Sequence, residues 1–409
     1  MSTQRSLFGR ITDTVRPSRA RARDRRDRIA GALLGVHVGD SLGATHEFAS
    51  GPNTGEQTRD IVGGGTFRWE AGQPTDDTDL TLAVMRAHLA HPDDDDAMVR
   101  DAADRMVAWM ESGPRDIGGT TRKTLGAVRN GVPLGQTGAT HEHSAANGSL
   151  MRCIPTGALI ADPARRRVVT DMVGGITHGL PVCRDSCIVY NDVVAALVDG
   201  ADFEDAVRDA VSDPRIAIEV RDAVFDVLSA GPDGPPPVEY GQKQGWVLGS
   251  LRTAVWAGLQ PDGEQALIEV ANAGGDADTN GAIAGGLIGA RDGMSALPER
   301  WLDTIWHHDE MVDAAAVFAD RREREGRALR RRDRVDRPGR GDRGGVGSAG
   351  GPYGADASRR CGAATRAGGR CQQRIANGTC PHHGSIGGPS RGTPRRVAAR
   401  AAIRDPFVP

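Results

Sequence analysis

Residues 281–293 read GAIAGGLIGARDG, a run in which small side chains stand where a helix usually carries bulky ones. Small residues let a neighbouring backbone approach closely. We therefore expect this segment to be a helix at the crowded centre of the fold. Around it, residues 30–320 are rich in Ala, Leu, Val, Asp and Arg and show hardly any period-two alternation, which favours helices over strands. The expected fold class is all-α.

Two further segments support helices. Residues 186–199 place Ile and Val side chains near 3.6-residue spacing, which predicts one buried helix face. Residues 93–96 are four aspartates followed by an amphipathic pattern that includes Met98 and Met106. An acidic run at this place is typical of a solvated helix N-terminus, so we interpret it as a cap and not as a metal site.

The charges are unevenly distributed along the chain. Residues 1–28 carry nine Arg against three Asp and residues 321–343 carry eleven Arg against five acidic residues, whereas residues 30–320 carry 21 basic and 44 acidic ones. An acidic body is a poor non-specific binder of nucleic acid, while the basic ends could contact nucleic acid or acidic partners, or could be disordered. The expected organisation is a basic tail (1–28), a catalytic domain (29–320), an Arg/Gly-rich linker (321–357), a small module (358–389) and a second basic tail (390–409).

The sequence has no stretch of the roughly 20 apolar residues that a membrane span needs and no apolar signal-peptide core, so a cytoplasmic protein is expected. Cys153, Cys183 and Cys187 lie in the body at spacings that suggest no disulfide framework. We expect them to be small buried side chains.

Two short acidic motifs stand far apart in the chain: residues 75–79 read TDDTD and residues 276–279 read DADT. Each places carboxylates beside a hydroxyl with no His or Cys, and such oxygen ligands suit Mg²⁺, Mn²⁺ or Ca²⁺ better than zinc. Either motif alone could be a helix cap. However, each follows a Pro or a pair of Gly and opens a helix that looks buried, where clustered carboxylates need cations to offset their desolvation.

Six motifs resemble the ADP-ribosylglycohydrolase family in order and spacing, between about residues 28 and 318. They are GALLGVHVGDSLGATHEF (31–48), PTDDTDLTLAV (74–84), SGPRDIGGTT (112–121), ANGSLMR (146–152), THG (177–179) and GGDADTNGAIAGGLIGA (274–290). The resemblance implies an all-α orthogonal helix bundle with a dinuclear Mg²⁺ or Mn²⁺ centre at the base of an ADP-ribose cleft.

The resemblance also implies roles for individual residues. Glu47 and Asp116 would be the catalytic carboxylates, of the kind that protonates a leaving group or activates water during glycoside hydrolysis. Asp116 could instead cap the turn before Gly118. The metal ligands would be Thr75, Asp76, Asp77, Asp276, Asp278 and Thr279. This chain has Asp79 where many relatives have Gln or Ala, which could alter metal preference or face solvent.

The remainder of the ADP-ribose would contact a turn and a histidine. The substrate-binding residues would be Asn147, Gly148, Ser149, Met151, Arg152 and His178. The turn at 147–149 could offer backbone amides to the pyrophosphate or be a simple loop, and a lone histidine is often structural. His141, Glu142 and His143, and the pair His307 and His308, lie outside the motifs, and we interpret them as a surface loop and a helix end.

Near the C-terminus, three cysteines and a histidine resemble a small zinc module of bacterial and phage proteins that contains an HGG motif. The Zn²⁺ ligands would be Cys361, Cys371, Cys380 and His383, with His382 as the competing choice. Unligated cysteines in a tail are the alternative. The module would dock to nucleic acid or to a protein.

The predicted function is metal-dependent hydrolysis of the glycosidic bond between ADP-ribose and a modified side chain of a protein or small molecule, most simply arginine. Alternatives are an O-linked substrate (serine, acetyl or poly-ADP-ribose), another phosphorylated substrate hydrolysed with the same two metals, and a non-catalytic member that only binds ADP-ribose. The intact carboxylate motifs argue against the last, since a site without metals has no reason to hold repelling charges together.

Overall fold

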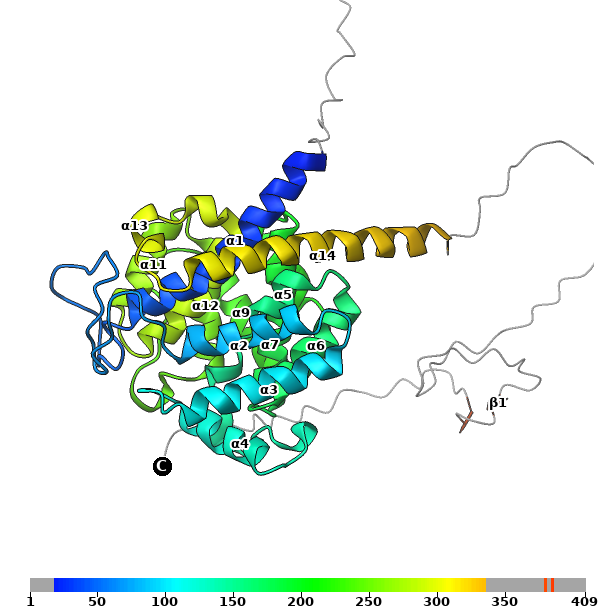
Figure 1. Cartoon of the computed structure of the whole chain (residues 1–409), viewed down its shortest axis with the longest axis horizontal. Coiled ribbons are helices and arrows are strands. Elements are labelled where there is room, and N and C mark those ends of the chain that lie inside the picture. The colour runs from blue at the N-terminus through cyan, green and yellow to red at the C-terminus, as the bar shows by residue number, and fades with distance from the viewer. Residues whose placement is uncertain (1–17, 336–378, 381–383, 386–409) are drawn as a thin grey trace, which may run out of the picture. The chain divides into compact units, whose positions relative to one another are not determined.

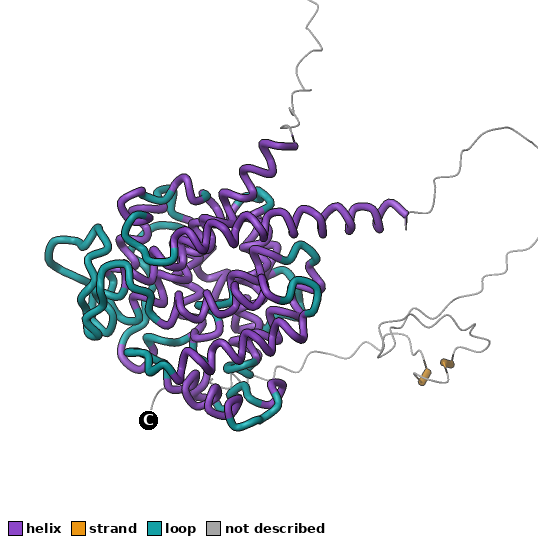
Figure 2. Tube along the Cα trace, viewed as in Figure 1, coloured by secondary structure: helices purple, strands orange, loops and turns teal. Residues whose placement is uncertain are grey.

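The structure is a computed structural model that describes residues 18–335, 379–380 and 384–385. The chain divides into two units, Met1–Asp336 with Asp405–Pro409, and Arg337–Arg404. Within the described ranges the first unit contains helices, turns and loops, with isolated β-bridges but no strand. The second contains two short antiparallel strands, β1 (Thr379–Cys380) and β2 (Gly384–Ser385), in which Cys380 pairs with Gly384 (Figures 1 and 2). The expected all-α class is confirmed for the first unit as described.

The α-helices of the first unit run in several directions, as Figure 1 shows. Their bounds are α1 Ser18–Gly43, α2 Asp76–Ala90, α3 Asp95–Glu111, α4 Gly119–Arg129, α5 Ile154–Leu159, α6 Pro163–Gly175, α7 Pro181–Val198, α8 Phe203–Val211, α9 Ile218–Ala230, α10 Val247–Leu259, α11 Gly263–Asn272, α12 Ala277–Asp292, α13 Glu299–Leu302 and α14 His308–Val335.

Helix α12 is the central helix that the small-residue run predicts, because its residues from Ala277 to Ala290 are all buried. It packs backbone to backbone against α1. A Cβ atom added to Gly35 would lie 2.1 Å from the carbonyl oxygen of Gly285, and one added to Gly39 would lie 1.9 Å from that of Gly281. We call this contact the glycine seam; it consists of Gly31, Gly35, Gly39 and Gly43 of α1 with Ala277, Gly281, Gly285 and Gly289 of α12.

Other helices cover this pair. Helix α7 contributes the apolar face predicted for residues 186–199, with Val189, Val193 and Leu197 buried. Its Tyr190 hydroxyl donates to the carbonyl oxygen of Ile283 at 2.9 Å, which ties α7 to α12. The predicted start of α3 is also confirmed, because Asp94 caps the helix by accepting from the backbone N–H of Ala97 at 2.9 Å.

The helices at the two ends of the first unit are longer than the sequence pattern predicts. Helix α1 begins at Ser18, so the expected basic tail 1–28 is partly helical, and Arg25 of this stretch pairs with Asp199 at 2.9 Å. Helix α14 continues to Val335, beyond the expected end at residue 320. Arg is a good helix former, and Arg322 is buried, donating to Asp199 at 2.8 Å and to the Ala195 carbonyl at 2.9 Å. Side-chain pairing therefore extends both helices where the apolar pattern ends.

The three body cysteines, Cys153, Cys183 and Cys187, are buried and free, as expected. Among the described helices, none combines the length and the apolar character needed to cross a membrane.

Candidate metal centre and active site

The two acidic motifs meet at the N-termini of α2 and α12. Thr75 caps α2 by accepting from the backbone N–H of Asp77. Before α12, Gly274 and Gly275 adopt φ values of +79° and +67°, which glycine reaches at little cost. As a result the Thr279 hydroxyl donates to the Asp77 carboxylate at 3.2 Å across 202 positions of sequence.

A third helix brings a carboxylate, inside the motif at 31–48, to which the sequence assigns no role. Asp40 of α1 is fully buried, and its Oδ2 accepts from the backbone N–H groups of Thr75 at 3.1 Å and Thr78 at 3.2 Å, and from the Thr78 hydroxyl. Carboxylate oxygens of Asp40, Asp77 and Asp278 lie within 4.8 Å of one another. The sequence does carry a sign of Asp40, because it is the one acidic residue inside the otherwise apolar, glycine-spaced run GALLGVHVGDSLG.

A second trio adjoins the first. Carboxylate oxygens of Glu47, Asp116 and Asp278 also lie within 4.8 Å of one another, so Asp278 belongs to both trios. Glu47 follows α1, and Asp116 lies in the loop between α3 and α4. We call Asp40, Glu47, Asp77, Asp116 and Asp278 the carboxylate cluster. Two adjacent trios that share one carboxylate are suited to hold two neighbouring cations.

Burial sets the electrostatics of the cluster. It raises the pKa of Asp40 to about 7 and, with the charges of Asp116, Asp276 and Asp76, that of Glu47 to about 9. Burial also raises the pKa of every other cluster carboxyl group, those of Asp77, Asp116 and Asp278.

Three buried carboxylate oxygens lack a hydrogen-bond partner among the described residues: Asp40 Oδ1, Glu47 Oε2 and Asp77 Oδ1. Buried polar atoms without partners are costly. Hard divalent cations prefer carboxylate oxygens and would satisfy these atoms. The residues present therefore fit a magnesium or manganese ion.

An open cavity of about 220 Å³ lies above this cluster. Of the residues predicted for the site, its walls contain Glu47, Asp76, Asp116, Asn147, Gly148, Met151, His178, Asp276 and Thr279. Thr75, Asp77, Asp278, Ser149 and Arg152 are buried and do not line it. The Asn147 amide donates to Asp276 Oδ2 at 2.7 Å and to the Ser250 hydroxyl at 2.9 Å, which joins the loop of Asn147–Ser149 to the N-terminus of α12.

Arg152 supports this loop from behind, which differs from the direct ligand contact expected. It is fully buried and donates to the carbonyl of Gly148 and to the Thr177 hydroxyl at 2.6 Å. The same hydroxyl contacts His178 Nδ1 at 2.8 Å, while His178 Nε2 has no partner among the described residues. Burial, and then the charge of Arg152, lowers the pKa of His178 to about 3, so its imidazole is neutral.

Other predicted residues lie elsewhere. His141, Glu142 and His143 form an exposed turn, as expected. Asp79 belongs to neither trio and accepts from Trp109 Nε1 at 2.8 Å. His308 begins α14, as expected of a helix end, but His307 lines a cavity beside the cluster. Of the predicted zinc ligands, Cys361, Cys371 and His383, and the competing His382, lie outside the described residues, and Cys380 is described only as part of β1.

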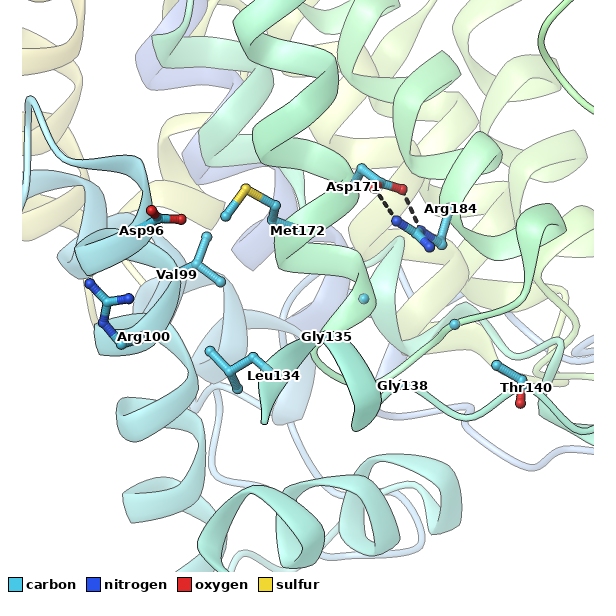
Figure 3. A pocket seen from close by; sticks show the side chains of 12 residues that line it. Asp96, Val99, Arg100, Leu134, Gly135, Gly138, Thr140, Asp171, Met172 and Arg184 are labelled. Atoms are coloured by element: carbon cyan, nitrogen blue, oxygen red, sulfur yellow. Dashed lines mark hydrogen bonds and ion pairs between the residues drawn. The ribbon is translucent and has the colours of Figure 1, made fainter. Parts of the chain in front are cut away.

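A separate cavity of about 380 Å³ lies among α3, α6 and α7 and contains none of the predicted site residues (Figure 3). Its wall includes a bidentate ion pair between Arg184 and Asp171. Gly138 and Gly179 also line it, and Gly179 follows the His178 of the active-site cavity directly.

Comparison with known proteins agrees with this geometry. Residues 21–368 match the family model described as ADP-ribosylglycohydrolase. The chain is 33% identical over 285 residues, 68% of this chain and 90% of the relative, to ADP-ribosyl-[dinitrogen reductase] glycohydrolase of Rhodospirillum rubrum. It is 30% identical to ADP-ribosylarginine hydrolase Tri1 of Pseudomonas putida, over 72% of this chain and 78% of the relative. A solved structure titled ADP-ribosylglycohydrolase-related protein complex superposes with a TM-score of 0.62 and 29% identity, over 73% of this chain and 99% of that one.

Proposed function

The chain belongs to the ADP-ribosylglycohydrolase family, and from this premise we propose that it hydrolyses the N-glycosidic bond between ADP-ribose and an arginine side chain of a modified protein. The observation that carries the proposal is the pair of carboxylate trios sharing Asp278 at the base of a cavity whose wall contains Asp116. The relative named ADP-ribosylarginine hydrolase supports the choice of arginine.

The cluster and its neighbours would hold two Mg²⁺ or Mn²⁺ ions. The ligands proposed are those predicted from the two motifs, Thr75, Asp76, Asp77, Asp276, Asp278 and Thr279, of which Asp77 and Asp278 belong to the trios. When bound, such a pair would supply Lewis-acid and template chemistry at the ribose. Asp40 would act as a positioning residue, because it holds the first turn of α2 through Thr75 and Thr78.

Asp116 and Glu47 supply the two carboxyl groups that glycoside hydrolysis needs, one to protonate the leaving nitrogen and one to activate water. Burial raises the pKa of both groups, that of Glu47 to about 9, and so favours their proton-carrying form relative to an exposed carboxyl group. Both line the same cavity, as a shared reaction centre requires.

The loop of Asn147–Ser149 and His178 would hold the ADP-ribose. Asn147, Gly148 and His178 line the cavity, and the partnerless His178 Nε2 offers one hydrogen bond to a ligand. Arg152 and Ser149 keep this loop in place from within the core.

The direct test measures ADP-ribose released from an ADP-ribosylated arginine peptide, with Mg²⁺ and after chelation, beside a matched peptide modified on serine. We expect release from the arginine peptide that depends on the metal. Release from the serine peptide alone would favour an O-linked substrate, and tight binding of ADP-ribose without release from either would favour a non-catalytic member.

The Asp116→Ala variant tests the catalytic assignment. We expect turnover to fall by about 10²–10⁴-fold, which is typical for loss of a proton-transferring carboxylate. The affinity for ADP-ribose should change far less, because the loop at 147–149 and His178 remain. Weak ADP-ribose binding with normal turnover at saturation would show that Asp116 only binds substrate.

A further inference from the structure

Beside the active-site cavity lies a second cavity of about 370 Å³ that shares part of its wall. Asp76 and Asp116 line both. The two parts of a substrate that is cleaved next to these carboxylates could therefore occupy different cavities. One cavity lies on the side of Asn147 and His178, and the other is the second cavity.

Three tryptophans and an additional carboxylate are among the residues that line the second cavity, together with Arg115 and His307. Trp69 comes from the loop before α2, Trp109 from the end of α3 and Trp306 from the turn before α14. Asp79 lies among them, with its Oδ2 held by Trp109 Nε1 at 2.8 Å. We call this space the tryptophan cavity. Asp79 is outside both carboxylate trios, and the side chains of Arg86 and His307 are its cationic and titratable neighbours.

Aromatic faces together with carboxylates are the surroundings that bind a guanidinium group well, because the planar cation stacks on a ring while its N–H groups donate to oxygen. The protein itself provides an example at this wall. The guanidinium carbon of Arg115 lies 5.6 Å from the ring centroid of Trp69, and Arg115 donates to the carbonyl of Arg68 at 2.8 Å. This arrangement occupies one face of Trp69 and leaves Trp109, Trp306 and Asp79 for a ligand.

We propose that the tryptophan cavity receives the guanidinium side chain of the substrate, with Asp79 and Trp109 as the residues that select a cationic leaving group. The inference rests on the proposed function and names the place of the leaving group. The scissile bond would lie beside Asp76 and Asp116, with ADP-ribose in the first cavity and the arginine side chain in the second. Trp306, which is 50% exposed, would form the outer edge, where the arginine continues into its protein.

The test uses binding as well as turnover. Agmatine carries a guanidinium, and N-carbamoylputrescine replaces it with an uncharged urea of similar shape while keeping the same terminal amine. Calorimetric titration of the full-length protein, saturated with ADP-ribose and Mg²⁺, should show binding of agmatine and much weaker binding of the urea analogue. In the Asp79→Asn variant the affinity for agmatine should fall by about tenfold or more, because a charged partner is lost. The KM for the arginine peptide should rise in parallel while the affinity for ADP-ribose stays within about twofold.

Two further variants keep the result interpretable. Asp104→Asn removes an exposed carboxylate from α3 and should change neither the affinity for agmatine nor the affinity for ADP-ribose. Trp306→Ala alters a half-exposed side chain, so it should fold normally, and it should weaken agmatine binding.

Equal agmatine affinities in the wild type, Asp79→Asn and Trp306→Ala would overturn the proposal, even if the enzyme cleaves arginine peptides. Agmatine binding that requires Asp79, in a protein that releases no ADP-ribose from arginine, would support the cavity while contradicting the proposed function.

Discussion

Along the glycine seam, α1 and α12 touch backbone to backbone, whereas at one end of the same two helices Asp40 and Asp278 bring like charges together. The seam is favourable because close packing and buried apolar surface stabilise it. The carboxylate cluster is unfavourable by itself, since burial raises the pKa of its members and leaves oxygens without partners. The comparison teaches that a tightly packed helix pair holds in place a group of charges that would otherwise separate.

The largest effect should come from breaking the seam. A valine at Gly35 would place its Cβ 2.1 Å from the Gly285 carbonyl oxygen, and a backbone atom in a packed helix cannot move aside. We expect Gly35→Val to destabilise the fold by more than about 4 kcal/mol. Urea unfolding followed by circular dichroism measures the change.

The control for this variant is Gly126→Ala in α4, where an added Cβ meets nothing within 4 Å. It should stabilise the protein by about 0.5–1 kcal/mol, as alanine usually does in place of glycine inside a helix. If Gly35→Val unfolds at the wild-type urea concentration, the seam is not the tight contact described.

The second-largest effect should come from removing the metal ions or one carboxylate of the cluster. Chelation should abolish hydrolysis and lower stability by about 3 kcal/mol relative to protein with metal at a hundred times its dissociation constant. Asp77→Asn should lose activity and the response to Mg²⁺, yet be at least as stable as the metal-free wild type, because one buried charge has gone. Thermal unfolding with and without Mg²⁺ measures both. Full activity in a chelated sample would contradict a metal centre.

A smaller loss of folding stability is expected at low pH. Its cause is a buried histidine in the helix packing and not the carboxylate cluster. His88 of α2 is buried against Phe318 and bonds the Thr156 hydroxyl at 2.9 Å. Burial, and then the charge of Arg165, lowers its pKa from 6.5 to about 3. Between these values the unfolded chain binds a proton that the folded chain does not, so stability falls as pH falls below 6.5.

We expect this histidine to remove about 2 kcal/mol of stability between pH 6.5 and pH 5. His88→Gln can keep a hydrogen bond to Thr156 but does not titrate. Over the same pH range this variant should therefore lose about 2 kcal/mol less stability than the wild type. Comparing the two proteins under the same metal-free conditions cancels the contribution of the cluster. Parallel pH profiles would show that His88 does not cause the acid sensitivity.

The smallest effect is expected from truncation. The described contacts of the seam and of the cluster all lie before residue 336. A chain ending at Val335 should therefore hydrolyse a small substrate at close to the full-length rate. A cut at residue 320 should be damaging, because it removes the buried Arg322 and also Glu325, which pairs with Arg165 at 3.0 Å. Inactive but folded protein ending at 335 would show that the second unit takes part in the chemistry.

The sequence predicts those parts of the molecule that depend on local pattern. The small-residue run predicts α12 as the central helix, and the aspartates at 93–96 predict the capped start of α3. Asp40 is missed because an aspartate inside a helix is usually solvated, and only the packing of α1 buries it. The length of α14 is missed because ion pairs, and not apolar periodicity, extend it.

The sequence motifs also do not predict the tryptophan cavity. Trp69, Trp109 and Trp306 come from three separate segments, and no spacing between them signals a common cavity. Similarly, Arg152 stands inside a predicted ligand-binding motif, but its full burial and its bonds within the loop appear only in three dimensions. A residue inside a motif can thus support the site from within the core without contacting the ligand.

The glycine seam also has a consequence for synthesis on the ribosome. Gly31 and Gly289 face each other, yet they are 258 positions apart in the sequence, which takes on the order of 10–50 s to translate. During that interval α1 has its closest-packed face uncovered. The N-terminal helix must wait for almost the whole domain before it can dock, so its many arginines would help to keep it from aggregating until α12 emerges.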